Sequence, residues 1–223
     1  MRFSFFKAAE SLPPGLPGAV LRERSDLRKK LRKGKVTAQT IDDGKNAFVV
    51  AIGDEIFKAP RLPQDIAAFK EELATQQLLS GKGLPVPDVT YTGKHSVFFG
   101  MKRLPGVTLH DVRAEITPEQ KRILAQDLAD AIIRMAKILP MKYGRFAQHG
   151  DMHSLNILVD PVTKKLTGII DFANLQYLGK DYLADVPLIK DIKTMVKEEY
   201  TRRKSEIPDP PAKIANKSIP PNP

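Results

Sequence analysis

The stretch that decides the fold is Q-H-G-D-M-H-S-L-N-I-L-V-D-P-V-T-K-K-L-T-G-I-I-D-F-A-N, residues Gln148 to Asn174. We expect a loop followed by two short strands joined in a hairpin. The loop carries Asp151 and, five residues later, Asn156, and the second strand ends at Asp171. Two carboxylates and an amide at the rim of a small sheet could hold magnesium and orient a hydroxyl acceptor beside a nucleotide phosphate, the layout of phosphoryl transfer.

Length and composition limit the class of protein. The chain has 223 residues, 42% hydrophobic and 28% charged, which suits one globular domain or two small lobes. It has no cysteine, which excludes a disulfide framework, a thiolate zinc site and a cysteine nucleophile. No apolar run is long enough to span a bilayer, and the charged, proline-containing start is a poor signal peptide. We therefore expect a cytoplasmic protein.

The formal net charge is +10, which suits anionic partners. Much of this charge lies in Leu21–Lys35, for which two interpretations stay open. The segment could be an RNA- or membrane-binding patch. It could also be a solvated helix face whose apolar residues dock inward: Val20, Leu21, Leu27 and Leu31. No aromatic side chains interleave there to stack on bases, which favours the docked helix over contact with nucleic acid or an anionic surface.

The first half of the chain alternates strand and turn signals. Prolines and glycines predict an irregular arm over 1–19, followed by a helix from Leu21 to Arg32. Turn signals at Asp43-Gly44 and Gly53-Asp54 separate three short β-type runs. The expected strands are 36–41, 47–52, 55–59, 89–92 and 96–102, with one helix over 64–80. These segments predict a five-stranded antiparallel sheet with one inserted helix.

The second half is predicted to be mainly helical. The run Thr117-Pro118-Glu119-Gln120 is a helix start signal, with a capping Thr, Pro at the first position and Gln three residues after the cap. The apolar stripe that follows, to Leu139, is typical of a core-facing helix. A further helix is expected from Asp181 to Lys204. The prolines beyond it predict a disordered tail over 205–223.

These features together resemble the aminoglycoside phosphotransferase and choline kinase-like family of the protein-kinase-like fold. The resemblance covers roughly Val36 to Pro187, and its most specific part is H-G-D-M-H-S-L-N-I-L-V-D followed by G-I-I-D-F. It implies a compact, two-lobed α+β enzyme. The implied parts are an arm and basic helix over 1–35, a nucleotide-binding lobe over 36–104, a helical catalytic lobe over 105–204, and the tail.

The resemblance also implies roles in the catalytic lobe. Asp151 would be the catalytic base that accepts the proton of the acceptor hydroxyl. Asn156 and Asp171 would bind Mg²⁺, for which oxygen atoms are suitable ligands. The nucleotide would be ATP, with its γ-phosphoryl group transferred to a hydroxyl.

In the first lobe, the resemblance implies that Lys58 contacts the nucleotide phosphates and that Glu72 holds Lys58 by an ion pair. Glu71 is the alternative partner. A short turn with Gly44 and Asn46 would cover the phosphates, although a plain hairpin turn is the alternative there. In the hinge, Met101 would line the adenine pocket, and backbone groups would face the adenine from two residues: Lys102 and Leu104.

His149 and His153 flank Asp151. Their spacing alone would suit zinc, but no third ligand cluster lies nearby in the sequence, so we expect His149 to brace the loop by hydrogen bonding. Two aspartates further on, Asp181 and Asp185, are expected to cap or brace rather than catalyse.

The acceptor is expected to be a small hydroxylated molecule, since Ala173 to Asp181 is too short for a protein-kinase activation loop. The basic charge disfavours a polycationic aminoglycoside and suits a phosphate-bearing, lipopolysaccharide-like or macromolecular acceptor. Two alternatives stay open. One is a compact atypical Ser/Thr kinase resembling the RIO or lipopolysaccharide-kinase groups. The other is a nucleotide-binding pseudokinase.

Overall fold

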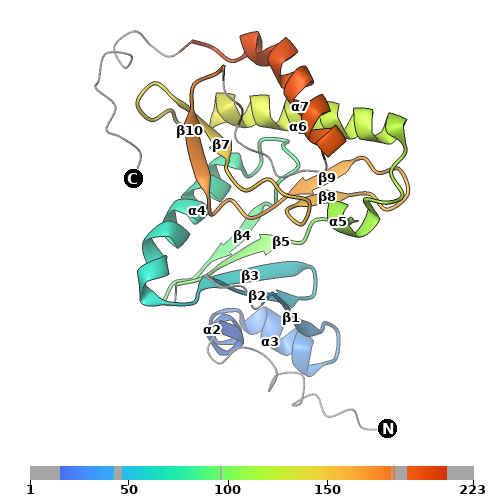
Figure 1. Cartoon of the computed structure of the whole chain (residues 1–223). Helices are drawn as coiled ribbons and strands as arrows, with labels where there is room; N and C mark the ends of the chain where they lie inside the picture. Colours follow the sequence, from blue (N-terminus) through green and yellow to red (C-terminus); the bar gives the residue numbers. More distant parts are fainter. Residues whose placement is uncertain (1–15, 43–46, 96, 182, 184–189, 210–223) are drawn as a thin grey trace. The chain divides into compact units, whose positions relative to one another are not determined.

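A computed structural model describes residues 16–42, 47–95, 97–181, 183 and 190–209. The chain divides into two compact units (Figure 1). Unit 1 comprises Met1–Gln77 and Pro87–Arg103, and unit 2 comprises Leu78–Val86 and Leu104–Pro223. The predicted α+β class is confirmed, with a five-stranded antiparallel sheet in unit 1 and the longest of the described helices in unit 2.

The sheet of unit 1 has the strand order β1-β2-β3-β5-β4, and every neighbouring pair is antiparallel. All five strands overlap the predicted segments: β1 (Ala38–Asp42), β2 (Ala47–Ile52), β3 (Glu55–Pro60), β4 (Val89–Thr92) and β5 (Phe99–Lys102). A 3₁₀ turn, η1 (Pro63–Asp65), leads from β3 into the helix α4 (Ile66–Leu79). The sheet and its one inserted helix are therefore those that the sequence predicts.

The two faces of this sheet carry different side chains because neighbouring residues of a strand point to opposite sides. Phe57 is fully buried in a core formed with the helices α2 (Leu16–Glu23) and α3 (Ser25–Arg32), which lie along one face (Figure 1). The next residue, Lys58, points to the opposite face, where it contacts α4. The sheet thus separates an apolar core from a face that buries a charge.

The N-terminal helical region differs from the prediction. One helix was expected from Leu21, but helix begins at Leu16 and is interrupted at Arg24, whose φ and ψ are −106° and 77°. Pro17 suits the first turn of a helix, so the arm becomes helical earlier than its prolines suggested. The interruption is held by the Arg24 guanidinium, which donates to Asp26 and to Glu55.

The longest helix of unit 2 is α6 (Pro118–Ile138), and it begins with the predicted capping box. The N–H of Gln120 donates to Thr117 Oγ1 over 3.3 Å, and the N–H of Thr117 donates to Gln120 Oε1 over 3.0 Å. The apolar stripe of α6 is buried and packs with α7 (Lys190–Arg203), as predicted for a core helix.

Among the described residues of unit 2 there are also five short strands and a short helix. They are β6 (Val107–Thr108), α5 (Leu109–Val112), β7 (Phe146–His149), β8 (Ile157–Val159), β9 (Leu166–Ile169) and β10 (Leu175–Leu178). The predicted hairpin of the deciding stretch is β8 and β9, to which β6 adds a third strand. β7 pairs antiparallel with β10. The prediction missed β6, β7 and β10 because runs of two to four residues leave no clear periodic pattern.

The C-terminal predictions need two corrections. The last helix begins at Lys190 rather than at Asp181, which lies in a turn. Leu183 is not helical either, and residues 184–189 lie outside the described residues. Ile207, in the predicted tail, is 1% exposed and packs in the core of unit 2 after a 3₁₀ turn, η2 (Lys204–Glu206). Residues 210–223 and Asp185 lie outside the described residues.

The two units alternate along the chain. Residues 78–86 belong to unit 2 because Leu79, Leu84 and Val86 pack in its core. Among the described residues, no helix has the length and apolar composition that crossing a membrane requires.

Candidate active site

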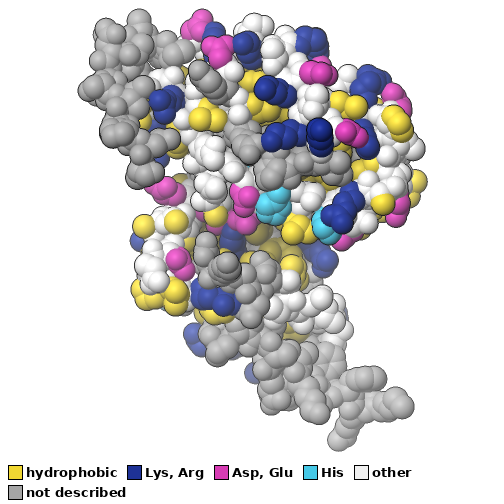
Figure 2. All heavy atoms as spheres, in the orientation of Figure 1, with side chains coloured by type: hydrophobic (Ala, Val, Ile, Leu, Met, Phe, Trp, Pro, Cys, Tyr) yellow, Lys and Arg dark blue, Asp and Glu magenta, His cyan; other side chains and the backbone are white. Residues whose placement is uncertain are grey.

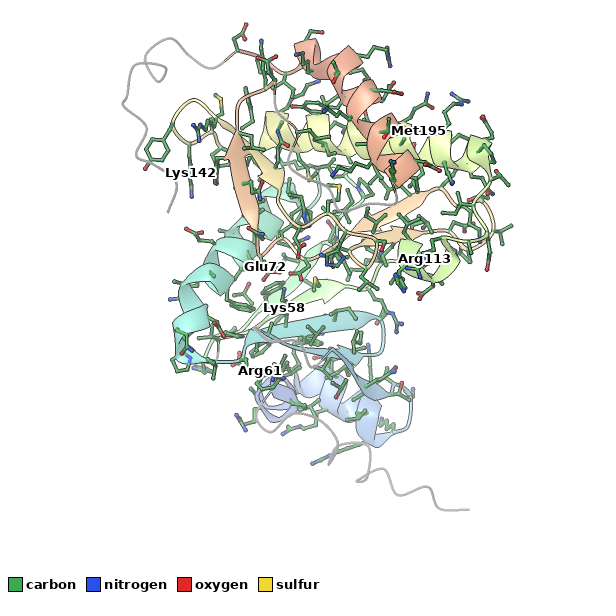
Figure 3. All side chains as sticks on the ribbon, viewed as in Figure 1. Lys58, Arg61, Glu72, Arg113, Lys142 and Met195 are labelled. Carbon is green, nitrogen blue, oxygen red and sulfur yellow. The ribbon has the colours of Figure 1, made fainter. Side chains whose placement is uncertain are left out.

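A buried ion pair lies on the face of the unit 1 sheet that meets α4. Lys58 Nζ lies 2.6 Å from Glu72 Oε1, and both residues are almost fully buried, at 6% and 4% exposed (Figure 3). The packed rings of Phe69 and Phe99, with centroids 5.1 Å apart, shield this face. Of the two candidate partners, Glu72 contacts Lys58, whereas Glu71 is exposed. Such burial is costly for two charges unless geometry holds them together.

In unit 2, the loop after β7 is folded by its own backbone. The N–H of His153 donates to Asp151 O and the N–H of Asn156 donates to His153 O, each over 2.9 Å. The N–H of Ile170 then donates to Asn156 O over 3.0 Å. Because Asp171 follows Ile170 directly, this last bond brings Asp171 beside Asn156. The three polar residues of the deciding stretch therefore gather at one end of the β8–β9 hairpin.

His149 connects the start of this loop to the turn at its far side. The ring is buried, its Nε2 lies 3.0 Å from Ile170 O, and its Nδ1 lies 3.2 Å from the N–H of Asp151. A carbonyl can only accept and an N–H can only donate, so Nε2 carries the hydrogen and Nδ1 is the acceptor. Burial lowers the pKa of His149, which keeps the ring in this neutral form. His149 thus has the bracing role that the sequence suggested.

The polar side chains of the loop contact one another. Asn156 Nδ2 donates to Asp151 O over 2.9 Å. His153 Nδ1 accepts the N–H of Leu155 over 3.2 Å, and its Nε2 lies 3.7 Å from Asp151 Oδ2. Asn156 is buried, whereas the Asp151 side chain is 45% exposed, so the carboxylate is accessible from solvent.

Asp171 has an unusual backbone. Its φ is +65°, a conformation that few residues other than glycine adopt and that often marks a functional position. The next residue, Phe172, is 1% exposed and packs edge-on against the His149 ring, with centroids 4.8 Å apart. The buried Phe172 anchors the turn, so the exposed Asp171 is displayed at a fixed place.

Two glycines of the stretch are required by close approaches. A Cβ at Gly150 would lie 2.7 Å from Asn174 O, and one at Gly168 would lie 2.6 Å from Leu104 Cδ1. The N–H of Gly150 also donates to Asn174 O over 2.7 Å, which joins the loop to the start of β10. A larger residue at Gly150 would force the loop away from the Asn174 backbone, whereas one at Gly168 would require the Leu104 side chain to move.

Comparison with known proteins identifies the family of the chain. The model of the phosphotransferase enzyme family (APH) matches residues 37–148. The chain belongs to this family. It is therefore a phosphotransferase, with an alcohol group as acceptor. The match ends one residue before His149, so it does not itself assign roles to the loop residues.

Solved structures of similar fold include aminoglycoside phosphotransferases. The ADP-bound APH(2'')-Ib is 16% identical, with a TM-score of 0.60, over 82% of this chain and 84% of that chain. The GDP complex of aminoglycoside 2'-phosphotransferase-IIIa is 17% identical, with a TM-score of 0.63, over 82% of each chain. The streptomycin–ATP complex of APH(2'')-IIa is 16% identical, with a TM-score of 0.59, over 81% of this chain and 84% of that chain. At these identities the likeness shows the fold alone. No curated protein sequence matches the chain.

The oxygen atoms at this site suit Mg²⁺, which protein and substrate phosphates hold together, better than a metal ion that protein side chains hold alone. Within the described ranges, no group of three or more His, Cys, Asp and Glu side chains is arranged to hold a metal ion. Mg²⁺ is commonly held by one or two protein oxygens together with substrate phosphates. The amide nitrogen of Asn156 is engaged by Asp151 O, which leaves the amide oxygen as its possible metal ligand. The Asp171 carboxylate would supply the second oxygen.

The remaining predicted nucleotide contacts are less complete. Gly44 and Asn46 lie outside the described residues. Met101 and Lys102 end β5, and the N–H of Lys102 donates to Asp88 O over 2.8 Å. The backbone N–H of Lys102 is therefore engaged within unit 1. Leu104 is half-buried against Gly168.

Sequence reasoning missed the segment that supports the loop from the β6–α5 side. The N–H of His110 donates to Ser154 O over 3.1 Å, and the guanidinium of Arg113 lies 3.0 Å from His110 Nδ1 (Figure 3 labels Arg113). Thr108 caps α5 by accepting the N–H of Asp111. The Thr-x-x-Asp spacing was the available signal for this short helix.

Proposed function

We propose that this phosphotransferase moves the γ-phosphoryl group of ATP to a hydroxyl of a small molecule in a Mg²⁺-dependent reaction, with Asp151 as the catalytic base. The observation that carries the proposal is the fold of the loop after β7, in which hydrogen bonds gather Asp151, Asn156 and Asp171 at one hairpin end. This is the set of groups that phosphoryl transfer requires.

In the proposed step, Asp151 accepts the proton of the acceptor hydroxyl. The acceptor oxygen bonds to the γ-phosphorus, the bond from that phosphorus to the bridging oxygen breaks, and ADP leaves. Asn156 and Asp171 would hold Mg²⁺, which supplies neutralisation of the phosphate charge when bound. The accessible carboxylate of Asp151 suits an acceptor that arrives from solvent.

Lys58 would bind the α- and β-phosphates, with Glu72 holding the ammonium in place. The buried pair supports this assignment because a Lys fixed by a carboxylate presents its remaining N–H groups in a defined direction. Gly44, Asn46, Met101, Lys102 and Leu104 remain the proposed further nucleotide contacts. ADP, ATP and GDP occur in the similar structures, so ATP and GTP must be compared directly.

The acceptor is proposed to be a small molecule because similar structures hold gentamicin or streptomycin. The net charge of +10 argues against a polycationic acceptor for this chain. Sugars, nucleosides and phosphate-bearing alcohols are therefore the first acceptors to screen, with aminoglycosides included.

The test is Mg²⁺-dependent consumption of ATP and of GTP with this acceptor panel, for the parent, Asp151→Asn and the control Glu198→Gln. Glu198 is an exposed carboxylate of α7. Loss of a catalytic base should lower turnover by about 10²–10⁴-fold, whereas the control should match the parent. Equal turnover in the parent and Asp151→Asn would refute the assignment of the base. Phosphate appearing on the protein instead of on any acceptor would favour the atypical protein kinase.

A further inference from the structure

The outer surface of the N-terminal helices is strongly basic. The segment Leu21–Lys35 has eight Lys and Arg residues against two acidic ones, a net of six positive charges in a chain of +10. Seven of the eight are exposed and form what we name the α2–α3 basic surface: Arg22, Arg28, Lys29, Lys30, Arg32, Lys33 and Lys35. The eighth, Arg24, is turned inward.

Both acidic residues of Leu21–Lys35 form hydrogen bonds with groups other than these seven cations. Glu23 accepts the N–H groups of Lys94 and His95, over 2.6 and 3.2 Å. Asp26 is engaged by Arg24, whose hydrogen bonds lower the pKa of Asp26 to about 2. Among the described residues, no carboxylate forms an ion pair with any of the seven cations. Within the part of the chain that the structure describes, their charge is therefore not neutralised by carboxylates.

The apolar side of the two helices is already occupied. Val20 and Leu27 are 0% and 2% exposed and lie in the core of unit 1, as the docked-helix interpretation predicted. A helix that inserts into a membrane interface needs an apolar face to bury there. Here that face belongs to the protein core, so only the charged side is available to a partner.

The arrangement of the cations favours a concave partner. With about 100° between successive residues, the exposed cations of α3 spread over roughly 200° of its circumference: Arg28, Lys29, Lys30 and Arg32. A flat bilayer can contact only one side of such a ridge. The major groove of B-form DNA, about 12 Å wide and flanked by two rows of phosphates, matches a helix about 10–12 Å in diameter.

We propose that the α2–α3 basic surface binds double-helical nucleic acid through its phosphates, without preference for base sequence. The surface has no aromatic side chain for stacking on bases, so phosphate contacts dominate. On the face of unit 2 that Figure 2 presents, Asp and Glu side chains are instead interspersed among the exposed cations. This inference is independent of the proposed reaction.

The test is fluorescence anisotropy of the full chain with labelled mixed-sequence DNA and RNA duplexes at several salt concentrations. The variant R28Q/K29Q/R32Q/K33Q removes four charges of the surface. The control K70Q/K165Q/K190Q/K197Q removes four exposed lysines elsewhere. Circular dichroism and thermal unfolding establish that both variants are folded.

For the parent, we expect affinity to fall steeply with salt, by about 10³-fold or more between about 50 and 200 mM if six or more phosphates are contacted. In the surface variant, the negative slope of log K against log salt should become less steep by about 3 to 4. The control should keep the parent slope. Comparison of the DNA and RNA arms identifies which duplex binds. Equal losses in both variants, or no duplex binding at about 50 mM salt, would overturn the proposal. Binding only to phosphatidylserine vesicles in a parallel arm would also overturn it.

Discussion

The ion pair between Lys58 and Glu72 allows a prediction that separates stability from activity. The charges are 2.6 Å apart, and their side chains are 8% and 5% exposed. At an effective dielectric constant of about 20 their attraction is about 6 kcal/mol, most of which offsets the loss of hydration. Removing one partner, by Lys58→Met or Glu72→Gln, should therefore cost about 3–5 kcal/mol of unfolding free energy.

The double variant Lys58→Met/Glu72→Leu should recover most of this loss, because apolar residues of similar volume can replace a buried pair with little change in stability. It should nevertheless not turn over nucleotide, since the proposed phosphate ligand is gone. Stability is measured by urea unfolding, and activity by Mg²⁺-dependent nucleotide hydrolysis.

Glu71→Gln is the matched control, because Glu71 is the exposed neighbour of Glu72 on the same helix. It should change stability by no more than about 0.5 kcal/mol. The reasoning fails if Glu71→Gln is as damaging as Glu72→Gln. It also fails if the double variant keeps the parent rate of nucleotide hydrolysis.

Two further predictions concern the supports of unit 2. Burial lowers the pKa of His149 in the folded protein, so stability should fall as pH drops from the unfolded pKa of 6.5 towards the lower folded pKa. Thermal unfolding of His149→Gln should therefore depend less on pH over this range. The exposed control His95→Gln should behave as the parent does. Gly106→Ala should lower stability by about 1–3 kcal/mol, because φ is +109° and a Cβ would lie 2.6 Å from Val159 O. Gly81→Ala, with open space around it, should cost less in the same denaturation assay; equal losses would contradict the steric reason.

Local patterns predicted much of this fold. The turn signals around Gly53 and the alternating runs beside them located the strands of unit 1. The capping residues Thr117 and Gln120 located the start of α6. Each of these signals acts over a few residues, which is why it survives in the folded chain. Short strands such as β7 and β10 could not be predicted, since each is stable only by pairing with the other.

The sequence by itself determined the order of the chemical groups: a strand lysine, a helix glutamate, then Asp151, Asn156 and Asp171 at fixed intervals. It also determined that Leu21–Lys35 is basic. Only the tertiary structure decided that Glu72 rather than Glu71 meets Lys58, and that His149 is buried as a neutral ring. The physical reason is that burial and charge pairing depend on segments distant in the chain. Packing of the helices on the sheet turns Arg24 inward and leaves seven cations facing solvent.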